Sequence, residues 1–169
     1  TPIYPPFLFL PKLAGRQCVQ IPMHANPAIQ RWTIDWDEFE AALTPDVKIF
    51  WLCHPHNPTG MVFEKEDLLH IADICERKNV AVVSDEIWDD IILDENIQHI
   101  PFASLDHPAA KRAITFIAAS KTWNIAGLGC AAAIILTNAA TAVATGWRWA
   151  CADGEPARLC SIRSSMARW

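Results

Sequence analysis

The sequence has no run of Lys or Arg residues and no long uninterrupted apolar segment, although 51% of its 169 residues are hydrophobic. The first absence, together with a formal net charge of -5, argues against a dedicated nucleic-acid or membrane-surface binder. The second leaves no candidate membrane span, because a spanning helix needs about 20 apolar residues. The chain starts at Thr1 without a basic segment, so we expect no secretory signal and a cytoplasmic protein.

The cysteines lack the spacing of a zinc site or a disulfide framework. No interval between them recurs, and they stand at positions 18, 53, 75, 130, 151 and 160. Cys53 ends an apolar run and Cys75 falls on a helical face, which favours buried free thiols. A metal site is the alternative for the neighbouring Cys53, His54 and His56. Pro55 separates the two imidazoles, however, and no second Cys/His pair follows at a zinc-like interval, so we expect no metal.

The remaining composition is that of an ordinary globular chain. Charged residues make up 20% of the sequence and the mean hydropathy is +0.12. Such a chain has too much apolar content and too little net charge to be disordered. Its length suits one domain of typical size.

One stretch predicts a strand, a helix and a second strand in succession. Residues 47–53 are a short apolar run typical of a buried strand, and a turn rich in Pro, Asn and Gly follows. The next segment has the helical period, with Leu68, Ile71 and Cys75 on one face. Residues 80–83 are again apolar and predict another buried strand. This βαβ pattern, within about 35 residues, implies parallel strands joined by a right-handed crossover.

Further elements complete the prediction of an α/β fold, an open and mostly parallel sheet covered by helices. They are a strand over residues 16–22, a helix over 35–43 with Asp35 as its N-cap, and strands over 113–118 and 131–136. In open α/β sheets, ligands bind at the carboxyl ends of the strands. The polar residues that follow predicted strands are therefore the candidate site.

Asn57, Asp85 and Lys121 each follow one of these strands. An amide, a carboxylate and an amine would then converge on one crevice. Pyridoxal phosphate needs this combination: an amine for a Schiff base, a carboxylate for the ring nitrogen and a donor for the ring oxygen.

Four segments carry a resemblance to a known family. They are Thr1-Pro2-Ile3-Tyr4-Pro5-Pro6-Phe7, His56-Asn57-Pro58-Thr59-Gly60, Ser84-Asp85-Glu86-Ile87-Trp88 and Ser120-Lys121-Thr122-Trp123-Asn124-Ile125-Ala126-Gly127-Leu128. In this order and at these intervals they resemble the fold-type I pyridoxal-phosphate enzymes of the class I/II aminotransferase superfamily. The likeness is greatest to the MalY/PatB-type cystathionine β-lyases, which are carbon–sulfur lyases. It covers about residues 1–138 and implies the central part of that family's large domain.

The resemblance implies a role for each matching residue. Lys121 matches the lysine that holds pyridoxal phosphate and then takes the substrate Cα proton. Asp85 matches the carboxylate that faces the pyridine nitrogen, and Asn57 matches the amide that bonds the ring hydroxyl oxygen. Tyr4 matches the aromatic residue that stacks on the ring, and its hydroxyl could assist proton transfer. Ser120 is a further candidate, near the phosphate.

Two positions separate this chain from ordinary aminotransferases. Trp88 stands where many of them have a Tyr whose hydroxyl reaches the ring oxygen, and Gly129 stands where they have a phosphate-binding Arg. The sequence that follows Lys121 fits the lyase branch better. These features favour β-elimination over transamination.

Each candidate also has a structural interpretation. Asn57 in a Pro-flanked turn can be a simple turn former, and Asp85 beside other acidic residues can belong to a solvated face or a helix start. Lys121 alone can be a surface lysine, and Tyr4 can be a core residue. Their joint placement at strand ends favours the functional interpretation.

The resemblance ends near residue 138. We expect residues 1–137 to be a partial cofactor-binding large domain, and residues 138–169 to be a tail that departs from the family through a frameshift or genuine divergence. The tail has four Arg and no Lys, Phe or Tyr, and no periodicity places its Trp residues in a common core. The family's upstream phosphate-binding segment and its C-terminal small domain have no match here. Members usually act as homodimers, so we expect a homodimer of the full-length protein.

Two classes of function follow from the sequence. The first is a β-lyase that converts cystathionine or a cysteine S-conjugate into pyruvate, ammonia and a thiol, with an aminotransferase of the same fold as the alternative enzyme. The second is a non-catalytic remnant or an interaction module on this fold, which the unmatched flanks suggest. Either way, the expected partner is a small amino acid rather than nucleic acid or membrane.

Overall fold

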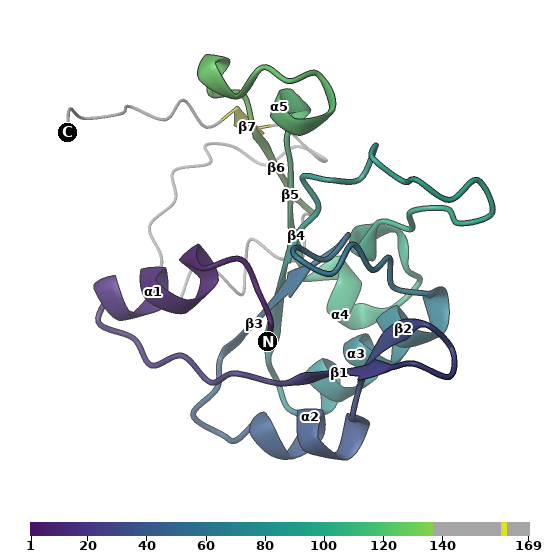
Figure 1. Cartoon of the computed structure of the whole chain (residues 1–169). Coiled ribbons are helices and arrows are strands. Elements are labelled where there is room, and N and C mark those ends of the chain that lie inside the picture. Colours follow the sequence, from purple (N-terminus) through teal and green to yellow (C-terminus); the bar gives the residue numbers. More distant parts are fainter. Residues whose placement is uncertain (137–159, 162–169) are drawn as a thin grey trace.

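The computed structural model describes residues 1–136 and the backbone of residues 160 and 161, and this part of the chain contains two sheets (Figure 1). The larger sheet has the strand order β3-β4-β5-β6-β7: β3 is Ile49–Cys53, β4 is Ala81–Asp85, β5 is Ile114–Ile117, β6 is Ala132–Ile135 and β7 is Cys160–Ser161. A separate hairpin pairs β1 (Met23–Asn26) with β2 (Arg31–Ile34). The helices are α1 (Pro6–Leu13), α2 (Trp36–Ala42), α3 (Lys65–Arg77), α4 (Pro108–Lys111) and α5 (Ala119–Thr122), with 3₁₀ turns η1 (Phe102–Ser104) and η2 (Ala126–Leu128).

The predicted βαβ unit is formed by β3, α3 and β4. The two strands are parallel, and their register pairs Cys53 with Asp85. The first turn of α3 is closed by a capping box between Glu64 and Asp67, and Asn79 follows the helix with a φ of 55°. Strand β5 is parallel to β4 on its other side. The carboxyl ends of three neighbouring strands therefore meet at one edge of the sheet.

Strand β6 reverses the direction of the sheet. It pairs antiparallel with β5, and β7 pairs antiparallel with β6. The chain between β5 and β6 contains only the four-residue α5, the η2 turn and a left-handed Gly129. Because no long helix crosses the sheet there, the chain folds back at the edge where β5 ended. The sheet is thus parallel from β3 to β5 and antiparallel beyond.

The two faces of the sheet differ in their covering. Helices α2, α3 and α4 lie on one side and α1 lies on the other (Figure 1). On the first side Leu52 and Val82 are only 2% and 1% exposed, and they join a core that includes Phe39, Leu68, Ile71, Ile74 and Phe102. On the second side Trp51 is 38% exposed, and it contacts α1 through Phe7 at a ring-centre distance of 4.8 Å. The side that α2, α3 and α4 cover contains the hydrophobic core.

The strand predicted over residues 16–22 is absent, and that prediction was wrong. The backbone N–H of Met23 donates to the carbonyl of Thr1 at 2.9 Å, so the end of this segment lies against the start of the chain. The hairpin ladder begins only at Met23, because the turn at residues 27–30 sets its register with β2. An alternating pattern predicts which side chains a strand would bury, but it supplies no hydrogen-bonding partner.

The cysteine prediction was confirmed in part. Cys53 and Cys75 are buried free thiols, as expected, and Cys18 is a free, half-buried thiol. Cys130 is free but exposed, so its prediction as a buried thiol was wrong. It directly follows Gly129, in the segment that turns back toward β6. The side chains of Cys151 and Cys160 lie outside the described residues.

The predicted boundary after residue 137 and the tail 138–169 lie outside the described residues, apart from the backbone of β7. In residues 1–136, no helix is both long and apolar enough to cross a membrane. The same part of the chain holds no group of three or more His, Cys, Asp or Glu side chains arranged to bind a metal ion.

Candidate functional site

The candidate residues meet at the carboxyl edge of β3, β4 and β5. The turn that follows β3 carries Asn57, β4 ends in Asp85, and Lys121 lies on α5 just after β5. The carbonyl of Asp85 accepts a hydrogen bond from the backbone N–H of His54 at 2.9 Å, which joins the ends of β3 and β4. The electric charge of Lys121 acts on the Asp85 carboxyl. Three segments distant in sequence thus end at one edge of the sheet, and the charges of Asp85 and Lys121 interact there.

Asp85 is a half-buried carboxyl with a perturbed pKa. Burial raises its pKa above the ordinary value, a hydrogen bond from the backbone N–H of Ile87 lowers it, the charge of Glu86 raises it, and the charge of Lys121 lowers it. The bond from Ile87 is long, at 3.4 Å, and leaves most of the carboxylate free. A cation brought against this carboxyl would favour its ionised form.

Asn57 is held by its backbone rather than by its side chain. Its N–H donates to the thiol sulfur of Cys53 at 3.4 Å, and its carbonyl accepts from the N–H of Tyr4 at 3.1 Å. Burial raises the pKa of Cys53 to about 11, so this sulfur is a neutral acceptor at physiological pH. Within the described chain the Asn57 carboxamide makes no hydrogen bond and is available to a ligand.

Tyr4 is brought to the site by the same backbone bond to Asn57. Its side chain is 48% exposed, and its ring touches Phe7 edge-to-face at 6.4 Å. Phe7 in turn packs on Trp51 of β3, which anchors the start of α1 on the sheet. The phenol ring therefore stands beside the strand ends with one side uncovered.

Lys121 projects over an indole ring. Its Nζ lies 5.2 Å from the centre of the Trp88 ring, and it forms no ion pair with any residue of the 1–136 segment. The hydroxyl of Thr122 donates to Asp90 at 3.2 Å, which ties α5 to the loop that carries Trp88. A cation over an aromatic face is stabilised without being neutralised. The contact therefore positions Lys121 without a carboxylate partner in the described chain.

Ser120 is not joined to the other candidates by any hydrogen bond in the described chain. Its carbonyl accepts from Ile125 at 3.1 Å, within the turn after α5, and its side chain is half-buried. Ser120 precedes Lys121 in the sequence, but the described chain shows no side-chain contact that would indicate a role for it.

The sequence named Cys53 only as a possible metal ligand, and it treated Trp88 only as a departure from aminotransferases. Cys53 is the parallel partner of Asp85 and lies on the same face of the sheet, but this register is visible only in the structure. The contact between Trp88 and Lys121 also had no signal in the sequence, since it depends on how α5 folds back over the end of β4.

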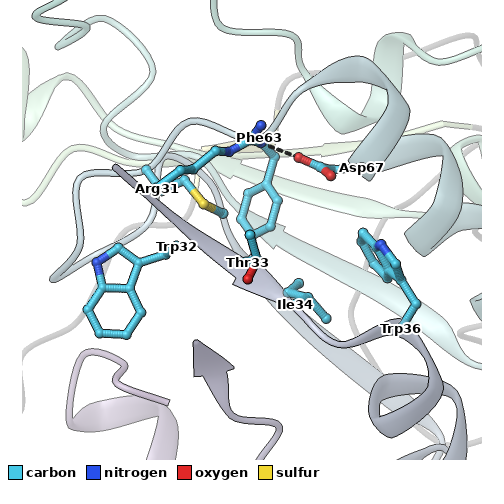
Figure 2. Close-up of a pocket in the computed structure, with 8 residues that line it drawn as sticks. Arg31, Trp32, Thr33, Ile34, Trp36, Phe63 and Asp67 are labelled. Carbon is cyan, nitrogen blue, oxygen red and sulfur yellow. Dashed lines mark hydrogen bonds and ion pairs between the residues drawn. The ribbon is translucent and has the colours of Figure 1, made fainter. Parts of the chain in front are cut away.

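A separate cavity of about 140 Å³ lies between β2 and α3, away from the strand ends (Figure 2). Its walls hold none of the candidate residues and are formed by Arg31, Trp32, Thr33, Ile34, Trp36, Met61, Phe63 and Asp67. Figure 2 shows Arg31 joined to Asp67, and its guanidinium also pairs with Glu64. Two carboxylates already neutralise this cation, so the cavity is a poor candidate for an anionic ligand.

The donor set at the strand ends fits pyridoxal phosphate. An unpaired amine, a carboxyl whose pKa burial has raised, an unbonded carboxamide and an uncovered phenol ring match the aldehyde, ring nitrogen, ring hydroxyl and ring face of that cofactor. The residues are Lys121, Asp85, Asn57 and Tyr4.

Comparison with known proteins agrees with the resemblance that the sequence motifs indicate. Residues 1–163 match the family model described as aminotransferase class I and II. The chain is 41% identical over 138 residues to the cystathionine beta-lyase PatB of Bacillus subtilis, an alignment that covers 79% of this chain and 34% of that protein.

Two solved structures extend the comparison. The structure of cystalysin from Treponema denticola, which contains pyridoxal 5'-phosphate, matches with a TM-score of 0.75 and 36% identity over 80% of this chain and 34% of that one. The N-succinyldiaminopimelate aminotransferase of Mycobacterium tuberculosis matches with a TM-score of 0.69 and 31% identity, over 75% of this chain and 32% of that one. The chain spans about a third of the length of the relatives it matches.

Proposed function

Because this chain belongs to the aminotransferase class I and II family, we propose that it contains the cofactor-binding core of a pyridoxal-phosphate-dependent carbon–sulfur β-lyase. The full reaction converts cystathionine or a cysteine S-conjugate into pyruvate, ammonia and a thiol. The observation that carries the proposal is the meeting of Lys121, Asp85 and Asn57 at one edge of the sheet. The similarity to a cystathionine β-lyase and to cystalysin supports the lyase rather than another activity.

Bound pyridoxal phosphate would supply an electron sink for negative charge that develops on the substrate Cα. Lys121 would hold the cofactor's aldehyde carbon and then accept the Cα proton on its Nζ. The Trp88 face, 5.2 Å from Nζ, would stabilise the resulting ammonium. The protonated lysine would then be the donor of a proton to the leaving thiolate.

Asp85 would hold the protonated ring nitrogen. In the described chain its pKa is raised chiefly by burial, so a bare carboxylate is disfavoured at this position. A pyridinium N–H placed against it supplies the missing positive charge, and each group then stabilises the charged form of the other. Such a pair keeps the ring cationic, which is the state that withdraws electrons.

Asn57 and Tyr4 would orient the cofactor plane. A backbone hydrogen bond of 3.1 Å joins the two residues, so both side chains start from neighbouring points at the strand ends. The carboxamide would donate to the ring hydroxyl oxygen, and the phenol ring would stack on one side. Ser120 would lie toward the phosphate.

The test of the lyase is the product formed from cystathionine by the whole expressed polypeptide loaded with pyridoxal phosphate. Pyruvate released without any added keto acid supports the proposal. A strict requirement for a keto acid would instead support transamination, the second candidate, which the similarity to an aminotransferase structure keeps in view.

The non-catalytic alternative is tested by the absorption spectrum with pyridoxal phosphate. A band that forms with the native sequence and is lost in Lys121→Ala argues for a working cofactor site. Identical spectra for both argue for a remnant or an interaction module.

Five further expectations belong to this proposal. Residues 1–137 would be part of a larger cofactor-binding domain, and residues 138–169 would depart from the family. The full-length protein would act in the cytoplasm, and it would be a homodimer. Its substrate would be a small amino acid.

A further inference from the structure

A buried carboxylate lies next to the proposed cofactor ligand. Glu86 directly follows Asp85 and is only 1% exposed. Its Oε1 accepts hydrogen bonds from the Ser84 hydroxyl at 2.7 Å and from the backbone N–H of Phe102 at 3.0 Å. Its Oε2 lies 2.9 Å from the Nε2 of His99. A carboxylate this deeply buried is retained only where donors surround it.

Two neighbouring imidazoles, tilted by 32° to each other, complete this cluster. The ring of His54 is fully buried and lies 4.4 Å from the ring of His99. His54 accepts from the N–H of Phe63 on Nδ1 and donates from Nε2 to the Ile100 carbonyl, so both of its nitrogens are used in the neutral form. His99 is then the imidazole that faces Glu86, and its Nδ1 has no hydrogen-bond partner in the described chain.

The cluster closes the long loop that contains Trp88. Glu86 stands where the chain leaves β4, and His99 and Phe102 stand where it returns at η1. The loop between them carries Trp88 under Lys121. The buried carboxylate of Glu86 thus links the two ends of the loop that carries Trp88. Glu86 is also the sequence neighbour of Asp85.

We propose that Glu86 and His99 form a buried positioning pair that sets Asp85 and Trp88 toward Lys121 and thereby toward the cofactor. This inference rests on the proposed function. Neither side chain is a catalytic residue, because both contact only protein groups. The pair acts by fixing the direction in which β4 ends and the path of the loop that follows.

The chain offers a matched control in a second histidine–carboxylate pair. The Nε2 of His107 lies 3.1 Å from Asp73 on α3, and its Nδ1 accepts from the N–H of Ala109 at the start of α4. This pair stabilises the side of the sheet that α2, α3 and α4 cover, and it contacts none of the candidate residues. A loss of general stability is expected from breaking either pair, but only the Glu86 pair adjoins the site.

The experiment compares His99→Phe with His107→Phe in the whole expressed polypeptide. Phenylalanine keeps a ring over His54 and removes the Nε2 donor. Three quantities are measured: the thermal midpoint, the dissociation constant for pyridoxal phosphate, and the pH midpoint of the absorption band that depends on Lys121. Glu86→Gln, which keeps an oxygen acceptor for Ser84 and Phe102, serves if His99→Phe does not fold.

We expect both His variants to lose thermal stability, and His99→Phe alone to weaken cofactor binding by about tenfold or more and to displace the pH midpoint of the band. The inference is overturned if His99→Phe, or Glu86→Gln in its place, keeps the native dissociation constant and midpoint. If the native protein shows no absorption band that is lost in Lys121→Ala, both the proposed function and this inference are wrong. The Lys121→Ala spectrum therefore separates a failure of the proposed function from a failure of this inference alone.

Discussion

The ammonium of Lys121 lies over the indole ring of Trp88, with 5.2 Å between Nζ and the ring centre. The two residues come from different connections, one after β5 and the other after β4. An aromatic face attracts the ammonium without accepting its proton, so it holds the lysine side chain in place. This contact gives Trp88 a role at the position where the sequence showed only the absence of a tyrosine.

Removing the indole is expected to slow proton transfer at the substrate Cα. In Trp88→Ala the Lys121 ammonium loses a contact of about 0.5–1 kcal/mol, which corresponds to a rate reduced by roughly two- to fivefold. The measurement is deuterium exchange at the substrate Cα. Trp88→Phe keeps an aromatic face and should exchange faster than Trp88→Ala; equal rates for the two variants would contradict the cation–π role.

Removing the amine has a much larger expected effect. Lys121→Ala should abolish the absorption band that pyridoxal phosphate forms with the protein, and should lower turnover by about 10²–10⁴-fold through loss of the base. The control is Lys111→Ala, which changes a lysine at the end of α4 that pairs with Asp106 on the surface. An unchanged band in Lys121→Ala would exclude Lys121 as the cofactor lysine.

Asp85→Asn is expected to act in opposite directions on the cofactor-free and cofactor-loaded protein. The folded pKa of Asp85 is raised, chiefly by burial, so its ionisation destabilises the free fold as the pH rises above the unfolded value near 3.8. The variant should therefore unfold at a higher temperature than the native chain at neutral pH, and the difference should vanish at lower pH. Its affinity for pyridoxal phosphate should fall by about tenfold or more, because the carboxylate is lost. Thermal melts across pH with and without cofactor measure both effects, and weaker stability of Asp85→Asn without cofactor at neutral pH would contradict the argument.

Acid should destabilise the fold through His54. Burial, with a further contribution from the charge of His99, lowers the pKa of His54 to about 4 from an ordinary value of 6.5. The unfolded chain then binds the proton first as the pH falls, so stability is lost between about pH 6.5 and pH 4, by roughly 3 kcal/mol for this residue. Urea unfolding at several pH values should show a smaller loss in His54→Gln. His24→Gln, which makes the same substitution at an exposed histidine, is the control for effects of the substitution itself.

The N-terminus of α2 gives a test of the fold itself. The Asp35 side chain accepts from the N–H of Glu38 at 3.0 Å and caps the helix. Asp35→Ala should cost about 1 kcal/mol of unfolding free energy, measured by urea unfolding. Asp37→Ala, which changes an exposed acidic residue of the same turn without a capping bond, should cost clearly less.

The sequence pattern was sufficient to predict those helices and strands that could be inferred without knowing their neighbours in the fold. The capped helix at Asp35, the amphipathic α3 and the apolar strands β3, β4 and β5 follow from side-chain period and cap residues, and all five were confirmed. The strand at residues 16–22 failed because hydrogen-bonding partners come from elsewhere in the chain. The same reason explains the antiparallel β6, whose direction depends on the short α5 rather than on its own residues.

The sequence by itself determined which residues stand at strand ends, because Asn57, Asp85 and Lys121 each follow a short apolar run that is typical of a buried strand. Only the tertiary structure decided what surrounds them: the indole beneath Lys121, the thiol behind Asn57 and the buried Glu86–His99 pair beside Asp85. These contacts join residues far apart in the chain, and loop paths rather than periodicity bring them together. Burial and charge at such contacts set the pKa values of the site, which is why its chemistry required the folded chain.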